Sequence, residues 1–330
     1  MRDTRFDKYI GREQDAEFLA GNGLVEQNED DLKEEQILFN SAMPYSLIWK
    51  DTNDFKKIIA WDSDWEKFLD HRIKIINLKG FENWLPWKVH EQLGIKLVNG
   101  FALNQAAIGT CAGAGFRNTG VCSDLINTKM ANQKTFVEMS FELVYSLARG
   151  NGRLNWGSGC NGTGLVKYGT EIGNHWTSDM GPYTTRGSMV TQANLNNPEF
   201  KKRALQKQSI VAFLPSVSFD LFFKACSAGF SIWIGSPTYP SGAKKSNGLS
   251  VVGGWTNGAH ATGFTFGAMI DGEPMLFFQN SHGDRYRGGA GDRFNSPASG
   301  TWVSRKDFPM FKITKNYGTP FVHCCELPNV

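Results

Sequence analysis

One cysteine of this chain, Cys111, lies in a run of small and almost uncharged residues, GFALNQAAIGTCAGAG (100–115). Small neighbours are compatible with a crowded site, because a buried thiol packs as a small hydrophobe. They are also compatible with a reactive thiol, because a substrate must reach the sulfur. A thiol nucleophile further requires a base, a group that orients the base, and donors that face the developing oxyanion.

Two later segments could supply the base and its orienting group. His260 lies in GGWTNGAHATGFTF (253–266), where a glycine-punctuated turn leads into an alternating strand. Asn280 ends the apolar strand of MLFFQNSHGDRY (275–286). Two neighbouring strands would hold an imidazole and a carboxamide at their ends, which is a rigid mount for a catalytic pair.

Other chemistries have little support in the sequence. There is no GxSxG, HExxH or Walker motif, and the glycine pairs in GAGF and GTGL lack the full dinucleotide-binding spacing. We therefore predict no cofactor. His323, Cys324 and Cys325 could suggest zinc, but adjacent residues of a strand point to opposite faces, and no second pair with ligand spacing exists. We predict no metal site.

The order Gln105, Cys111, His260, Asn280 resembles that of papain-like cysteine proteases. NQAAIGTC resembles the family pattern Asn/Gln-Gln-x-x-x-Gly-Ser-Cys, and LPWKV resembles the segment that opens the mature enzymes. MSFELVYS followed by GSGCNGTG, the GAHATGFTFG strand and the FFQNSHGDRY strand each resemble a family motif in the same order. The resemblance covers about residues 84 to 325.

The resemblance implies a role for each of these residues. Cys111 would be the nucleophile at the N-terminus of a helix, where the helix dipole favours a thiolate. His260 would be its ion-pair partner and would later protonate the leaving amine. Asn280 would fix the tautomer and orientation of the ring, and Gln105 would form the oxyanion hole with the backbone N–H of Cys111.

The resemblance also implies an α+β, papain-like two-lobed fold, with a helical lobe, a β-barrel-like lobe and the active-site cleft between them. Asn161 and Gly162 would lie in the loop that pairs with the substrate backbone. The patterns along the chain agree, because they are mostly helical up to about Gln206 and β-rich after Lys207. Apolar spacing predicts a helix in TFVEMSFELVYSLARG (135–150) that ends at Gly150. We divide the chain into 1–80, an acidic extension; 81–206, the helical lobe; and 207–330, the β-rich lobe.

Four departures from the family pattern concern the site. The family has tryptophan at the positions of Ala112 and His282. His282 could be a lid over the site or a second imidazole, but we favour a histidine of a surface loop. The helix after Cys111 begins Ala-Gly-Ala-Gly, which predicts a looser and wetter start because interior glycine destabilises a helix. Ile108 replaces the cysteine that would bridge Cys160, so we predict a free thiol at Cys160.

Composition limits the partners. The first 40 residues carry five basic and eleven acidic side chains, and they could be a solvated extension, an inhibitory pro-segment or an arm for an assembly partner. A net charge of +3 over 330 residues gives no reason to expect a nucleic acid or a membrane surface as partner. The start lacks the apolar core of a signal peptide, so we expect a protein of the cytoplasm or of a virus particle.

Three functions remain open from the sequence. The one we favour is a cysteine peptidase that hydrolyses a protein or peptide substrate through a Cys-His-Asn triad and a thioester. The second is a structural or virion-associated protein with the same fold and weak or no proteolysis. The third is acyl transfer, such as transglutaminase-like or deamidating chemistry, against which Asn280 argues mildly because such enzymes usually orient the histidine with an aspartate.

Overall fold

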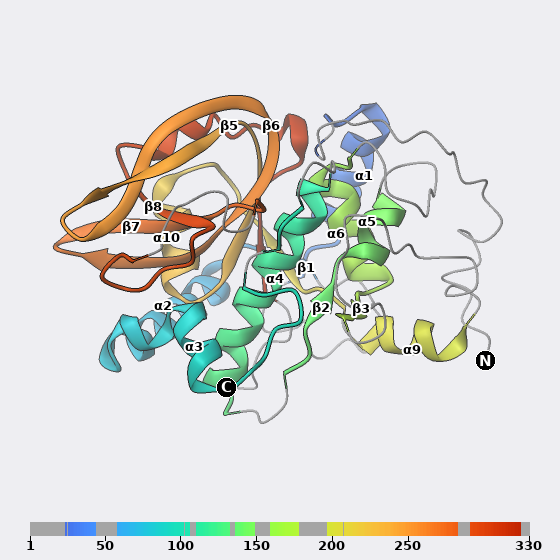
Figure 1. Cartoon of the computed structure of the whole chain (residues 1–330). Helices are drawn as coiled ribbons and strands as arrows, with labels where there is room; N and C mark the ends of the chain where they lie inside the picture. The colour runs from blue at the N-terminus through green and yellow to red at the C-terminus, as the bar shows by residue number, and fades with distance from the viewer. Residues whose placement is uncertain are drawn as a thin grey trace.

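The computed structural model describes ten parts of the chain (Figure 1). They are residues 24, 26–43, 58–101, 103–105, 110–132, 136–148, 159–177, 197–206, 208–282 and 291–324. Ile108 and Cys325, which the sequence argument uses, lie outside these parts.

Helices and strands alternate irregularly along the chain. The α-helices are α1 (Glu29–Asn40), α2 (Ser63–Leu78), α3 (Pro86–Gln92), α4 (Cys111–Met130), α5 (Glu142–Ala148), α6 (Gly162–Glu171), α9 (Pro198–Gln206) and α10 (Phe219–Ser227). Short 3-10 helices are η3 (Phe81–Trp84), η5 (Phe308–Phe311) and η6 (Lys315–Tyr317). The strands are β1 (Ile58–Ile59), β2 (Met139–Ser140), β3 (His175–Trp176), β4 (Val211–Phe213), β5 (Ser231–Ser246), β6 (Leu249–Ile270), β7 (Glu273–Gln279), β8 (Gly300–Ser304) and β9 (Phe321–His323).

Seven of the described strands form one sheet in the order β1-β4-β9-β5-β6-β7-β8. Most neighbours are antiparallel, and β5 and β6 form a long hairpin with register shifts at three places. The sheet is not closed into a barrel, which corrects the barrel-like lobe expected from the sequence. Its first strand, β1, is only two residues long and pairs with β4 alone among the strands of this sheet. The α+β class is confirmed.

Helix α4 lies in the middle of the molecule, with the strands β5 to β8 on one side and α1, α5 and α6 on the other (Figure 1). Eighteen of its twenty residues are buried. Its early glycines permit this packing. A Cβ at Gly113 would lie 2.3 Å from the ring of Phe141, and one at Gly115 would lie 3.2 Å from the backbone of Thr262 in β6. The expected loose and wet start is therefore wrong, because these glycines let the helix touch its neighbours.

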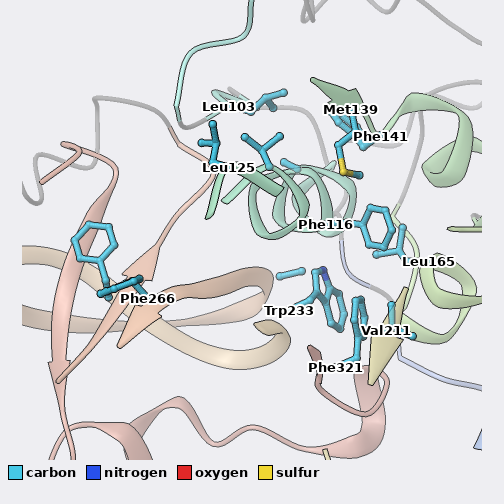
Figure 2. Packing of buried hydrophobic residues seen from close by; sticks show 14 of the residues in the cluster. Leu103, Phe116, Leu125, Met139, Phe141, Leu165, Val211, Trp233, Phe266 and Phe321 are labelled. Atoms are coloured by element: carbon cyan, nitrogen blue, oxygen red, sulfur yellow. The ribbon is translucent and has the colours of Figure 1, made fainter. Parts of the chain in front are cut away.

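Strand β5 is joined to the start of α4 by an indole. Trp233 Nε1 donates to the carbonyl oxygen of Ala112 at 3.1 Å, and its ring stacks on Phe321 of β9 with centroids 5.4 Å apart. Figure 2 shows these two rings side by side, with Phe116 of α4 and Leu165 of α6 nearby. This contact ties the first turn of α4 to the sheet.

The predicted helix over 135–150 is shorter than expected. Met139 and Ser140 form β2 and pair antiparallel with β3, and α5 begins only at Glu142. The apolar residues of this segment are buried by a short strand followed by a helix, and not by one continuous helix. The helix α10 contains Cys226 and agrees with the apolar helical pattern around this residue, whereas the sequence does not predict the strand β8.

The described part of the N-terminal segment packs into the body. Leu24 forms a parallel bridge with Cys160, and Gln27 N–H donates to Asn316 O at 2.6 Å. Phe39 of α1 stacks on Phe213 of β4 with ring centroids 4.4 Å apart. None of the helices described above combines the length and the apolar character that crossing a membrane requires.

Candidate active site

Cys111 is the first residue of α4 and is 1% exposed. Its Sγ accepts a hydrogen bond from the backbone N–H of Ala261, with 3.4 Å between nitrogen and sulfur. Both an N–H donor and the positive end of a helix dipole stabilise a thiolate relative to a thiol. These two features favour a thiolate, whereas the burial of the sulfur opposes a charge on it.

His260 lies in β6, directly before Ala261, and pairs with Ser236 of β5 in register. The last β6–β7 pair joins Gly263 and Gln279, so Asn280 is the first residue after β7. The structure thus brings the imidazole and the carboxamide together, but the turn expected before His260 is wrong, because residues 253–258 belong to β6 and His260 lies inside this strand. His260 Nε2 lies 2.8 Å from Asn280 Oδ1.

This contact determines the tautomer of His260. Asn280 Oδ1 also accepts the backbone N–H of Ser281 at 2.7 Å, so this oxygen is the acceptor in both bonds. Nε2 of His260 therefore carries the hydrogen. In the neutral ring, Nδ1 is then the nitrogen with a free lone pair, and it is the atom that can take a proton.

The imidazole of His260 is neutral at pH 7. Burial lowers its pKa to about 3, and the hydrogen bond to Asn280 opposes this shift while the charge of His282 adds to it. The side chain is 5% exposed. The family resemblance implies a pre-formed ion pair between Cys111 and His260. Burial of the His260 ring does not favour such a pair. The geometry instead supports a neutral base that becomes charged only when the thiol gives up its proton.

His282 stacks on His260. The two imidazole rings are almost parallel, at 2°, with centroids 5.0 Å apart. His282 is half-buried, and burial lowers its pKa below the usual value for histidine. The interpretation of His282 as a surface-loop histidine is therefore wrong, and a second imidazole lies at the site.

Tyr239 of β5 also contacts His260, and the sequence analysis missed it. The two ring centroids are 4.3 Å apart, with 41° between the planes. Burial raises the pKa of the half-buried Tyr239 phenol, and a thiolate at Cys111 would raise it further. No motif marks this tyrosine, because only the register of β5 against β6 brings it to the imidazole.

Gln105 is held beside Asn280 by a short antiparallel contact. Its backbone N–H donates to Ser281 O at 2.9 Å, and the Ser281 hydroxyl donates to Gln105 Oε1. The preceding residue, Asn104, forms a bridge with His282. Because Oε1 accepts from Ser281, the NH₂ group of Gln105 is the end of the amide that can donate to an oxyanion.

The buried Arg117–Glu138 ion pair ties the segment before Gln105 to α4. Arg117 also donates to the carbonyl oxygens of Gly100 at 3.0 Å and Phe101 at 3.2 Å, and Glu138 accepts the N–H of Val98 at 2.6 Å. Arg117 and Glu138 are both buried, and their contacts fix residues 98–101 relative to the helix that carries Cys111.

Asn161 and Gly162 start α6. Asn161 is the N-cap and accepts the N–H of Gly164 at 3.0 Å, and a Cβ at Gly162 would lie 2.5 Å from the ring of Trp233. The structure gives both residues a packing role, and contact with a substrate stays a prediction for them. Cys160 forms no disulfide, as predicted.

The described residues hold no group of three or more His, Cys, Asp or Glu side chains placed for a metal ion. His323 lies between Ser209 Oγ, 3.0 Å from Nε2, and Thr119 Oγ1, 3.4 Å from Nδ1. Cys324 packs in the apolar cluster that includes Phe222 and Phe264, where burial raises the pKa of its thiol well above the usual range.

Known structures similar to this one include two described as cysteine proteases and a digestive procathepsin. Xylellain, a cysteine protease from Xylella fastidiosa, is 14% identical, with a TM-score of 0.45 over 67% of this chain and 81% of its own. Procathepsin L 3 of Tenebrio molitor is 10% identical, with a TM-score of 0.44 over 71% and 68%. The ragweed pollen allergen Amb a 11, a cysteine protease in its proform, is 12% identical, with a TM-score of 0.43 over 96% and 99%.

No protein-family model matches the chain. No curated protein matches it by sequence. The chemical interpretation of the site therefore rests on its own geometry.

Proposed function

We propose that the chain is a papain-like cysteine peptidase that cleaves peptide bonds of a protein substrate. The observation that carries the proposal is that two consecutive residues of β6 contact the other two members of the site, His260 the carboxamide of Asn280 and Ala261 the sulfur of Cys111. Asn280 Oδ1 fixes the Nε2–H tautomer of His260, and Ala261, the next residue, donates its N–H to Cys111 Sγ. This arrangement combines a nucleophile, a neutral base and an orienting group on a rigid helix and two paired strands.

In the proposed reaction, Cys111 Sγ attacks the carbonyl carbon of the scissile peptide and its proton passes to His260 Nδ1. The NH₂ group of Gln105 and the backbone N–H of Cys111 donate to the oxyanion. When the C–N bond breaks, the leaving amine takes the proton from His260 and a thioester remains. Water then attacks the thioester, gives its proton to His260, and the thiolate leaves and is reprotonated.

Selective alkylation tests the nucleophile. Iodoacetamide at pH 6 is expected to label Cys111 faster than Cys226, whose pKa burial raises well above the usual range. Peptide cleavage should be lost in Cys111→Ala and retained in Cys226→Ala, which is the matched control. Equal labelling of the two thiols would contradict the proposal.

A second function, a structural protein that keeps the fold without turnover, is favoured by one observation. Cys111 is 1% exposed and His260 is 5% exposed, so both reacting groups are covered in this conformation. Slow or absent cleavage together with a stoichiometric assembly would support this alternative. Robust cleavage that Cys111→Ala abolishes would exclude it.

A further inference from the structure

The stacked pair of His260 and His282 places two titratable rings at one site. Their planes differ by 2° and their centroids are 5.0 Å apart, so a charge on one ring lies close to a charge on the other. Two such groups titrate as a coupled pair, and the first proton hinders the second.

The position of His282 is held by the segment that carries the other site residues. His282 forms an antiparallel bridge with Asn104, and the residue before it, Ser281, is bound to Gln105 through both backbone and side chain. The ring is therefore fixed over His260 by the same contacts that position Gln105 and Asn280. It is part of the site framework and not a side chain on a free loop.

The two rings differ in access to water. His260 is buried and bonded to Asn280, whereas His282 is half-buried. Burial penalises the charged form more strongly in the more buried ring, so a proton from solvent goes to His282 first. Tyr239 of β5 contacts the His260 ring, and Cys111 of α4 accepts the N–H of the next residue, Ala261; both titratable groups are neutral or negative.

We propose that His282 is a positioning residue that decides, by its own protonation, whether His260 can accept the proton of Cys111. When His282 is neutral, His260 can become an imidazolium and the thiolate forms. When His282 is protonated, its charge opposes a second charge on His260, and the sulfur stays a thiol. This inference rests on the proposed function and assigns an acid-side control to the same site.

The test compares the pH dependence of Cys111 alkylation in His282→Phe and His282→Lys with the wild type. Phenylalanine keeps a stacking ring that is always neutral, and lysine keeps a charge at the position. The rate of iodoacetamide labelling of the Cys111 peptide is followed by mass spectrometry from pH 4.5 to 8, with no peptide substrate required. His71→Phe, at an exposed position of α2, is the matched control.

In His282→Phe the acid-side midpoint of labelling is expected to move to lower pH by about one unit. In His282→Lys labelling at pH 7.5 is expected to fall about tenfold, and His71→Phe should follow the wild type. If Cys111 labels quickly but His282→Phe keeps the wild-type midpoint, the inference is overturned and the proposed function stands. If Cys111 labels as slowly as Cys226 at every pH in the wild type and in His282→Phe, the proposed function fails and this inference fails with it. Near-wild-type circular dichroism of His282→Phe confirms that the comparison concerns a folded protein.

Discussion

Ala261 donates its backbone N–H to Cys111 Sγ, and the imidazole of the preceding residue is the candidate base. One strand, β6, therefore supplies both an N–H donor to the sulfur and the ring that would remove the proton in the proposed reaction. The distance between β6 and α4 controls both contacts. Gly115 sets that distance, because the backbone of Thr262 lies 3.2 Å from the place of its missing Cβ.

Gly115→Val is expected to separate α4 from β6. The buried branched side chain would overlap the Thr262 backbone, and overpacking of this kind costs about 1 to 3 kcal/mol of unfolding free energy. Urea unfolding measures that loss, and iodoacetamide labelling of Cys111 should slow in the same variant. Gly242→Ala is the control, since nothing lies within 4 Å of a Cβ at Gly242. A Gly115→Val protein as stable and as reactive as the wild type would refute the close contact.

Burial of His260 predicts that folding stability falls in acid. Its pKa is lowered to about 3 in the folded chain, against about 6.5 in an unfolded one, so the unfolded state binds the extra proton between these values. Stability contributed by the neutral ring is complete above pH 6.5 and is lost as the pH falls towards 3, by about 1.4 kcal/mol per pH unit. The measurement is the free energy of unfolding of wild type and His260→Gln at pH 7.5, 6.0 and 5.0. The glutamine variant should lose less stability than the wild type over this range, and parallel curves would contradict the burial of a neutral imidazole.

Tyr239 contacts His260 through its aromatic ring, so we expect the reactivity of Cys111 to depend on this ring. Tyr239→Phe keeps the ring that lies 4.3 Å from the imidazole and should keep Cys111 labelling within about twofold of the wild type, whereas Tyr239→Leu lets the imidazole rotate and should slow it about tenfold. Trp255→Leu is the matched control, because this half-buried indole of β6 contacts Phe311 and lies in the same hairpin. Slower labelling in Tyr239→Phe than in Tyr239→Leu would assign the effect to the hydroxyl instead.

The sequence predicts part of this site for identifiable reasons. His260 and Asn280 are found because strand alternation and strand ends are local patterns, and β6 and β7 are consecutive in the chain. Tyr239 is not found and His282 is assigned to a surface loop, because their positions depend on the register of β5 against β6 and on the bridge between Asn104 and His282. Such contacts join segments that no short-range pattern connects.

The fold follows the same division. The helix that begins at Cys111 follows from the family resemblance, and the β-rich second half is visible as composition and periodicity. The open sheet is not visible in these patterns, because its first strand comes from residues 58–59, which are far in sequence from the other strands. The glycines after Cys111 suggest weakness from propensity alone, and only the tertiary contacts of Phe141 and Thr262 reveal why small residues stand there.

Glu35 of α1 predicts that the N-terminal segment stabilises the body. This buried carboxylate accepts hydrogen bonds from Thr163 Oγ1 of α6 at 3.2 Å and from the Thr319 N–H just before β9 at 3.3 Å, so it joins a helix of the first half to the sheet of the second. Glu35→Ala leaves these donors without their acceptor, which is expected to cost about 1 to 3 kcal/mol of unfolding free energy. Asp30→Ala is the control on the same helix, because Asp30 is 92% exposed and pairs only with exposed Lys33 among the described residues. Thermal unfolding of both variants measures the difference. Equal midpoints would mean that α1 rests on the body without holding its two halves together, and a removable segment would then be the better interpretation.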